Sequence, residues 1–284
     1  MIARTDRNRN SMKSTVCKAI ACMLLMFSLP TWSNTFPDIV VLGDDARVLL
    51  LKQCTQPCRS GANSVATAPL GSSASSIASL AQRAKHAVIV VDATRGPLQI
   101  IREHILIARQ AGVPSLSLLF VNTGRVKDSE LLKMEEQEAR AVLSTYDLNG
   151  DQAALFTVKT LWRGGDELSD ALAALKNTPD RPEESLAFIN GQQLATFIYL
   201  LTPLESKWTL ALQKDSPVTV WINGRVSQGL VSSTHTLNPG DSGDMSLQLG
   251  APVSAATGSR FLLEREGRII ALGVVKGVGV QAAP

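Results

Sequence analysis

After residue 36 the chain alternates between short apolar runs and longer segments whose apolar residues recur at helical spacing. The apolar runs of strand length lie at residues 36–42, 87–91, 118–121 and 155–158, with a further run at 48–51. The predicted helices cover residues 98–111, 128–146 and 167–175. Residues 60–79, rich in Ser, Ala and Gly, are predicted to begin as a loop and to become helical near Ile77. Strands that are apolar on both faces and alternate with helices predict a mainly parallel sheet covered on both sides.

From Leu194 onward the pattern changes to short strands separated by turns, which is typical of a small antiparallel barrel or sandwich. The predicted strands are 196–201, 218–222, 246–249, 260–263 and 269–275, with a turn at 238–241. A Pro-rich stretch at 177–182 separates the two patterns. The sequence therefore predicts an α/β domain at 36–178, a linker at 179–186 and a small antiparallel β-barrel at 187–281.

The N-terminus has the order of a secretory signal peptide. A basic region precedes an apolar run at 19–29, and small residues follow it. This run is shorter than the roughly 20 residues that a spanning helix needs. We predict a signal peptide at 1–33, cleaved after Ser33, and therefore a periplasmic or secreted protein. The alternative is an uncleaved segment that anchors the chain in the inner membrane.

Composition and charge narrow the function classes. The chain is 45% apolar and 19% charged, as in an ordinary globular protein. Its formal net charge is only +3. Part of that charge comes from five basic residues in the predicted signal, Arg4, Arg7, Arg9, Lys13 and Lys18. The remainder is near neutral, so electrostatics do not indicate a nucleic-acid or acidic-membrane partner.

Four cysteines occur, and Cys17 and Cys22 lie in the predicted signal. The remaining pair, Cys54 and Cys58, could form a disulfide that closes a small loop in an oxidising compartment. A redox-active or metal-binding role is the alternative. It lacks the second cysteine pair or the clustered histidines that would complete a tetrahedral site.

Two long runs carry a resemblance to a known family. Residues 87–114 read A-V-I-V-V-D-A-T-R-G-P-L-Q-I-I-R-E-H-I-L-I-A-R-Q-A-G-V-P, and residues 258–275 read G-S-R-F-L-L-E-R-E-G-R-I-I-A-L-G-V-V. With the P-G-D at 239–241, they resemble the nucleotide-binding domain and the last barrel of elongation factor Tu, a translational GTPase. The resemblance implies a truncated GTPase-like α/β domain followed by a barrel, with no counterpart of the family's middle barrel.

The family's GTP-binding motifs are not matched. Gly43 is followed by Asp44 and Asp45, and no Gly-Lys-Thr occurs anywhere. The chain is predicted to run directly from the first strand into the second, without the loop helix and the first switch. The Asp-Cys-Pro-Gly-His of the second switch is matched by A-T-A-P-L at 66–70. Of the guanine-reading Asn-Lys-x-Asp only Asn122 remains, because Arg125, which can only donate hydrogen bonds, replaces the Asp. The resemblance therefore implies no nucleotide, no cofactor and no GTPase activity, with Asn122 as a vestigial position.

In the barrel, the family's basic tRNA-facing segment is replaced by E-S-K-W at 205–208, so no nucleic acid is expected. Asp92 and Arg95 follow a predicted strand, where α/β proteins place functional groups. A residual small-molecule site there is an open alternative, although no complementary acid, base or nucleophile accompanies the two residues.

Several other signals are weak. The G-D-S-G at 240–243 is similar to a serine-protease nucleophile segment but has no accompanying base. The D-L-N-G-D at 147–151 lacks the later ligands of a calcium loop. We expect His104 to be a satisfied helix residue, and Trp208 and Trp221 to lie in the core or at its rim. No catalytic or metal-binding residue is predicted.

The sequence favours a non-catalytic relative of elongation factor Tu in the bacterial envelope, acting through protein or surface interaction. Its protein partner is unknown, and peripheral membrane association is a further expectation. The alternative is a cytoplasmic GTP-binding elongation factor-like protein whose N-terminal extension is not a signal. A third hypothesis, a product without a role, is disfavoured by the intact apolar patterning of both domains.

Overall fold

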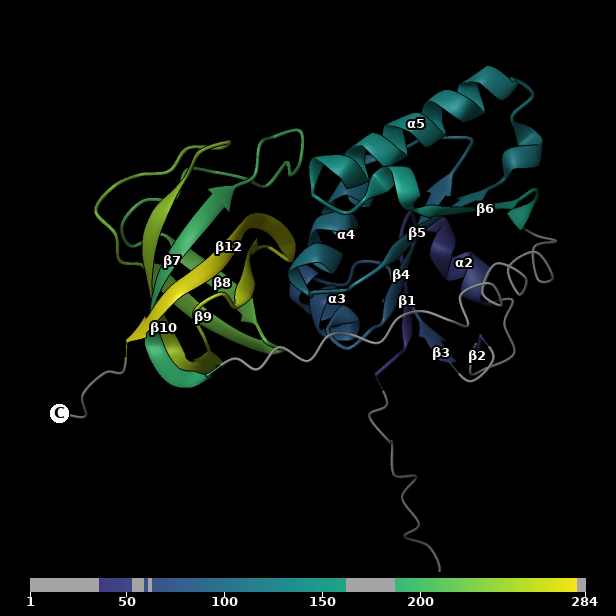
Figure 1. Ribbon diagram of the computed structural model, residues 1–284. Coiled ribbons are helices and arrows are strands. Elements are labelled where there is room, and N and C mark those ends of the chain that lie inside the picture. The colour runs from purple at the N-terminus through teal and green to yellow at the C-terminus, as the bar shows by residue number, and fades with distance from the viewer. Residues whose placement is uncertain (1–35, 53–58, 61–62, 162–186, 280–284) are drawn as a thin grey trace, which may run out of the picture. The chain divides into compact units, whose positions relative to one another are not determined.

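The computed structural model describes residues 36–52, 59–60, 63–161 and 187–279 (Figure 1). Four predictions lie outside the described residues: the signal peptide at 1–33, the pair Cys54 and Cys58, the helix at 167–175 and the linker at 179–186. In the described part of the chain, no helix combines the length and the apolar character needed to cross a bilayer.

The first domain is built on a mainly parallel sheet with the strand order β2-β3-β1-β4-β5-β6. Its strands are β1 (Ile39–Gly43), β2 (Arg59–Ser60), β3 (Asn63–Ala66), β4 (His86–Asp92), β5 (Leu116–Val121) and β6 (Ala154–Val158). All neighbouring pairs are parallel except β2 and β3, which pair antiparallel. Every residue of β1, β4 and β5 is buried, as the predicted fully apolar strands require. The prediction of a mainly parallel sheet is confirmed.

Helices cover both faces of this sheet (Figure 1). They are α2 (Ala46–Lys52), α3 (Ala74–Ala81), α4 (Gln99–Gln110) and α5 (Ser129–Thr145), with single 3-10 turns at Thr123–Arg125 and Gly150–Gln152. The apolar stripes of α3, α4 and α5 pack with Val40 and Leu42 of β1, whereas α2 packs with Ile39 and Val41 on the opposite face. Alternate residues of one strand therefore contribute to two separate cores.

Two elements near the N-terminus differ from the prediction. Residues 48–51 are part of helix α2 and do not form a second strand, so a helix does follow the first strand directly. Its N-terminus is capped by Asp44, whose Oδ1 accepts the backbone N–H of Ala46 at 2.8 Å. Strand β3 lies in the segment predicted as loop. Its sequence N-S-V-A buries only Val65, so its pairing with β1 and not an apolar run makes it a strand.

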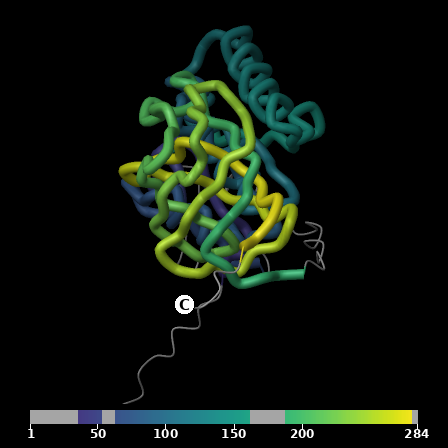
Figure 2. Tube along the Cα trace, turned by 90° about the vertical axis from the view of Figure 1, so that its left-hand side faces the viewer, coloured from purple at the N-terminus to yellow at the C-terminus, as the bar shows by residue number. Residues whose placement is uncertain are grey.

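The second domain, green to yellow in Figure 2, is a closed antiparallel barrel. Its strand order is β10-β7-β12-β11-β8-β9. Its strands are β7 (Ile189–Leu200), β8 (Pro217–Ile222), β9 (Arg225–Val231), β10 (Ser242–Ala255), β11 (Arg260–Arg265) and β12 (Arg268–Gly279). The predicted barrel is confirmed. The sequence did not predict β9, because this strand turns Val226 and Leu230 outward and buries Ser227.

The described residues of both domains belong to one compact unit. The buried indole of Trp221 on β8 donates a hydrogen bond to Ser79 Oγ of α3 at 2.9 Å. The Glu264 carboxylate of β11 accepts the backbone N–H of Ser75 at 2.6 Å. An ion pair joins Arg268 of β12 to Glu103 of α4, and Gln110 of α4 donates to the Phe261 and Gly273 carbonyls. Trp221 is thus a core residue of the contact between the domains, in agreement with the prediction.

Candidate functional site at the carboxyl edge of the parallel sheet

Three polar residues lie at the carboxyl ends of adjacent strands. Asp44 follows β1, Asp92 ends β4 and Asn122 follows β5. All three are buried, with 0%, 8% and 4% of their surface exposed. Parallel strands bring their carboxyl ends to the same edge of the sheet, where open α/β sheets bind ligands. This edge is therefore the first place to look for a site.

The connection from β1 to α2 is too short for a phosphate-binding loop. Only Asp44 and Asp45 lie between the two elements, whereas a phosphate-binding loop spans eight residues. Gly43 has φ +91°, and a Cβ placed on it would meet the Val90 carbonyl oxygen at 2.4 Å. The backbone therefore turns sharply against β4. A connection of this length leaves no room for the ring of inward-pointing N–H groups that holds phosphates.

Two arginines fold over this connection. Arg95 forms an ion pair with Asp44, and its Nε lies 3.8 Å from Asp92 Oδ2. Arg47 is almost fully buried, and its Nη1 donates to the carbonyl oxygens of Gly43 and Asp44 at 3.1 and 3.2 Å. The same atom donates to Asp45 Oδ1 at 3.0 Å. The charges at this edge are thus paired with one another by the chain itself.

Burial dominates the electrostatics of Asp44. It raises the pKa of that carboxyl above its ordinary value, although the Ala46 N–H and the Arg95 charge oppose the rise. The nearby Asp92 and Asp45 carboxylates raise the pKa further. One oxygen of Asp44, Oδ2, has no hydrogen-bond partner among the described residues. A further anion at this position would add repulsion to a carboxylate that is already poorly solvated.

Asn122, the position predicted to be vestigial, connects three segments. Its Nδ2 donates to Asp92 Oδ2 at 3.0 Å, and its Oδ1 accepts the backbone N–H of Leu161 at 3.1 Å. The other oxygen of Asp92 accepts from the Thr94 N–H and hydroxyl at 3.0 and 2.7 Å. Arg125, three residues later, is exposed. Asn122 therefore connects β4 and β5 to the segment that follows β6.

His104 of α4 is buried against the end of β1. Its Nδ1 accepts the backbone N–H of Gly43 at 2.8 Å. Burial, together with the charges of Arg47 and Arg268, lowers the pKa of His104 to about 3. The neutral ring is thus a satisfied hydrogen-bond acceptor, as the sequence predicted. It holds the sharp turn after β1 in place.

His86 is a second buried histidine, and the sequence assigned it no role. Its two ring nitrogens lie 2.7 Å from Ser115 Oγ and 2.9 Å from Ser117 Oγ. Burial lowers the pKa of His86 to about 4. Because both serines come from the neighbouring strand and the turn before it, only the strand pairing brings this set together.

Comparison with known proteins places this architecture among solved structures. No family model matches the sequence. The crystal structure of translation elongation factor SelB from Methanococcus maripaludis, in its apo form, superposes with a TM-score of 0.58 over 85% of this chain and 79% of that chain.

The fold resembles that of a translation elongation factor. At 13% identity the likeness shows the fold alone. The predicted resemblance to a translational GTPase is therefore confirmed at the level of the fold, for the sheet and the barrel together.

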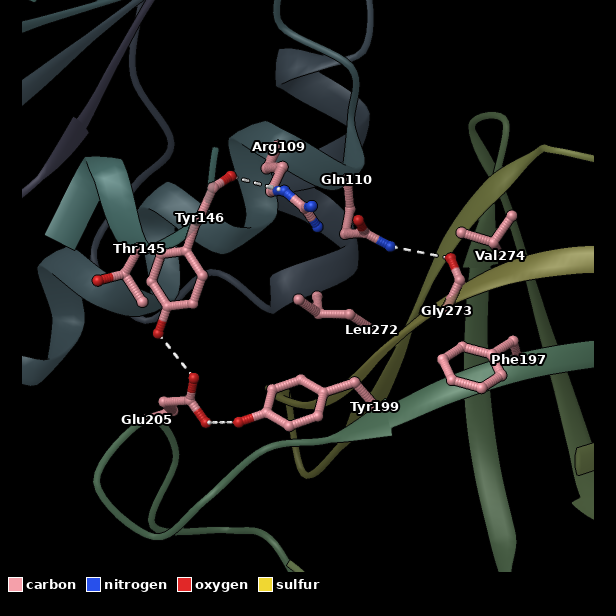
Figure 3. A pocket seen from close by; sticks show the side chains of 10 residues that line it. All are labelled: Arg109, Gln110, Thr145, Tyr146, Phe197, Tyr199, Glu205, Leu272, Gly273 and Val274. Carbon is pink, nitrogen blue, oxygen red and sulfur yellow. Dashed lines mark hydrogen bonds between the residues drawn. The ribbon is translucent and has the colours of Figure 1, made fainter. Parts of the chain in front are cut away.

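A cavity of about 450 Å³ lies where the α/β domain meets the barrel (Figure 3). Its lining comes from α4, the end of α5, β7, β12 and the segment after β7: Arg109, Gln110, Thr145, Tyr146, Phe197, Tyr199, Glu205, Leu272, Gly273 and Val274. Tyr146 and Tyr199 point toward the Glu205 carboxylate from the two domains and donate to its two oxygens, each at 2.7 Å.

Glu205 acts as a clamp between the domains. Besides the two tyrosine hydroxyls, it accepts the Thr202 N–H and hydroxyl at 2.8 and 2.9 Å. Burial opposes ionisation of Glu205, but these hydrogen bonds outweigh it and hold the pKa of the carboxyl below its ordinary value. Burial and the same carboxylate raise the pKa of Tyr199 to about 12 and also raise the pKa of Tyr146. The sequence flagged Glu205 only as a replacement in a tRNA-facing segment, because its partners come from distant parts of the chain.

The weaker signals fall on ordinary structural elements. Residues 240–243 form a turn and the start of β10, and residues 147–151 form the turn and 3-10 helix after α5. Among the described residues, no three His, Cys, Asp or Glu side chains are arranged to hold a metal ion.

Proposed function

We propose that this protein is a non-catalytic relative of elongation factor Tu that acts in the bacterial envelope through protein or surface interaction and does not bind GTP. The absence of GTP binding rests on the two-residue connection between β1 and α2, closed by the Asp44–Arg95 ion pair. The envelope location rests on the predicted signal peptide at 1–33. A GTPase needs this connection to be a long glycine-rich loop with a lysine that neutralises the phosphates.

Charge supports the same conclusion. Three carboxylates, those of Asp44, Asp45 and Asp92, gather where a nucleotide's phosphates would approach. Asp44 caps the N-terminus of α2, the position that an anion would otherwise occupy. Arg95, the cation nearest to this carboxylate, is already paired with it. A triphosphate would have to break this pair and approach an uncompensated carboxylate.

Isothermal titration of the purified protein with GTP and GDP in the presence of Mg²⁺ tests this proposal. We expect no binding heat, while a translational GTPase titrated in the same buffer provides the positive control. Circular dichroism of the same sample confirms that the protein is folded. Micromolar affinity for either nucleotide would overturn the proposal and favour the alternative, a cytoplasmic GTP-binding elongation factor-like protein.

Location is tested separately by fusing residues 1–35 to a reporter enzyme that is active only after export. The envelope assignment expects an active reporter, and replacing the apolar run at 19–29 with polar residues is expected to abolish its activity. An inactive reporter together with nucleotide binding would refute both parts of the proposal.

A further inference from the structure

In the segment between β7 and β8, large apolar side chains are exposed and polar side chains are buried, the reverse of the usual arrangement. We call residues 203–211 the 203–211 loop. Its exposed positions are occupied by Pro, Leu, Lys, Trp, Leu and Ala, at residues 203, 204, 207, 208, 210 and 211. Its buried positions are the polar residues Glu205, Ser206 and Thr209. Leu204 is 80% exposed, Leu210 63% and Trp208 44%.

This exposure is imposed by the fold, because several contacts hold the loop in place. Glu205 is fixed by Tyr146, Tyr199 and Thr202 through the four hydrogen bonds described above. The backbone N–H groups of Glu205 and Ser206 donate to the Thr202 carbonyl at 3.0 and 2.9 Å. The side-chain amide of Gln99, at the start of α4, lies against the backbone of the loop.

The loop also ends at a fixed point. Leu212 is fully buried, and it pairs with Leu237 through two backbone hydrogen bonds of 2.9 Å. With Glu205 anchored inside and both ends held, Leu204, Trp208 and Leu210 cannot turn inward without breaking these bonds. Little conformational entropy remains to be lost when a partner covers them.

The charge of the loop is one-sided. Lys207 is its only exposed charged side chain. Beyond the loop, the exposed Lys214 is followed directly by the exposed Asp215. The only acid of the loop, Glu205, is withdrawn into its clamp. Exposed leucines and a tryptophan next to lysine are the side chains that enter the interfacial region of a bilayer, with the ammonium at the level of the headgroups.

We propose that the 203–211 loop inserts Leu204, Trp208 and Leu210 into the interfacial region of an anionic phospholipid bilayer. The inference rests on the proposed function, because it names the surface on which the non-catalytic protein acts. It accounts for the exposure of three large apolar side chains on a loop that the fold holds in place.

The test uses the full chain with vesicles of phosphatidylglycerol and phosphatidylethanolamine that carry brominated acyl chains. Because residues 19–29 form an apolar run of their own, the readout has to report on the loop itself. Bromine quenches tryptophan fluorescence only at close range, and the difference between the wild-type chain and Trp208→Phe isolates Trp208. We expect the Trp208 signal to be quenched and shifted to shorter wavelength.

Two double variants, each replacing two exposed apolar side chains with serine, are compared for Trp208 quenching. Leu204→Ser/Leu210→Ser is expected to abolish the Trp208 quenching and to weaken vesicle binding through the loop about tenfold or more. Val226→Ser/Leu230→Ser removes two exposed apolar side chains of β9, 51% and 46% exposed, and is expected to leave the quenching unchanged. Lys207→Gln is expected to reduce quenching at low ionic strength.

Absence of Trp208 quenching in the wild-type chain, even if the chain sediments with the vesicles, would overturn the proposal. Equal quenching in Leu204→Ser/Leu210→Ser and the wild type would also overturn it. A Trp208 that lipid does not quench but that an envelope protein shields from acrylamide would assign the loop to a protein partner instead. Titrating GTP into the same preparation separates the two proposals, since nucleotide binding would refute the proposed function and leave a quenched Trp208 as it is.

Discussion

The buried histidine His104 makes a quantitative prediction for stability against pH. Its pKa is about 3 in the folded protein against an ordinary value of 6.5, so between these limits the unfolded chain binds a proton that the folded protein excludes. Stability from this group is therefore fully present above pH 6.5 and is lost as the pH falls toward 3. At pH 5 the loss is about 2 kcal/mol, from 1.5 pH units at about 1.4 kcal/mol per unit.

His86 contributes with the same sign, because its pKa is lowered from 6.5 to about 4. The two histidines together predict a loss of about 4 kcal/mol between pH 7 and pH 5. Asp44 and Glu103 act in the opposite direction, since burial raises the pKa of both carboxyls. These two carboxyls stabilise the folded protein as the pH falls through their folded pKa values. The total change in the stability of the wild type is therefore the sum of a loss from the histidines and a gain from the carboxyls.

Comparison with a variant isolates His104. The measurement is urea unfolding followed by circular dichroism at pH 7, 6 and 5. In His104→Asn the amide oxygen can still accept the Gly43 N–H, but the side chain at this position no longer titrates. Between pH 6 and pH 5 the wild type is expected to lose about 1.4 kcal/mol more than this variant. His235→Asn, at an exposed position, is the matched control and is expected to follow the wild type. Parallel pH profiles for wild type and His104→Asn would refute the assignment of a neutral buried acceptor.

Two further predictions concern the turn after β1 and the clamp between the domains. Gly43→Ala is expected to destabilise the protein by about 3 kcal/mol or more, because its Cβ would lie 2.4 Å from a β4 carbonyl oxygen. Gly71 also has a positive φ, but a Cβ placed there would have no atom within 4 Å, so Gly71→Ala is expected to cost only about 1 kcal/mol. The denaturant midpoints of the two variants measure this difference. Equal losses of stability would contradict the close approach of Gly43 to β4. Glu205→Ala is expected to cost about 3 kcal/mol, because it leaves two tyrosine hydroxyls without their acceptor. A double-mutant cycle with Tyr146→Phe should show a coupling of about 1 kcal/mol, and strict additivity would mean that the clamp is not formed in solution.

The elements that the sequence predicted are those whose signal is local. Strand β4 is seven consecutive buried residues, and α4 and α5 carry apolar residues at helical spacing with a recognisable turn or cap at their ends. Strands β3 and β9 were missed because they bury few apolar side chains and owe their conformation to the strands beside them. The helix at 46–52 was missed because a short apolar run is compatible with either structure.

By itself, the sequence determined the sheet followed by a barrel and the type of residue available at the strand ends. It could not determine how those residues pair. Arg95 meets Asp44 across 51 positions, and Glu205 meets Tyr146 across 59, so these contacts exist only because the sheet and the barrel bring distant segments together. Whether Leu204 is covered or exposed was likewise decided by the tertiary structure, because burial depends on what packs against a side chain and not on its own polarity.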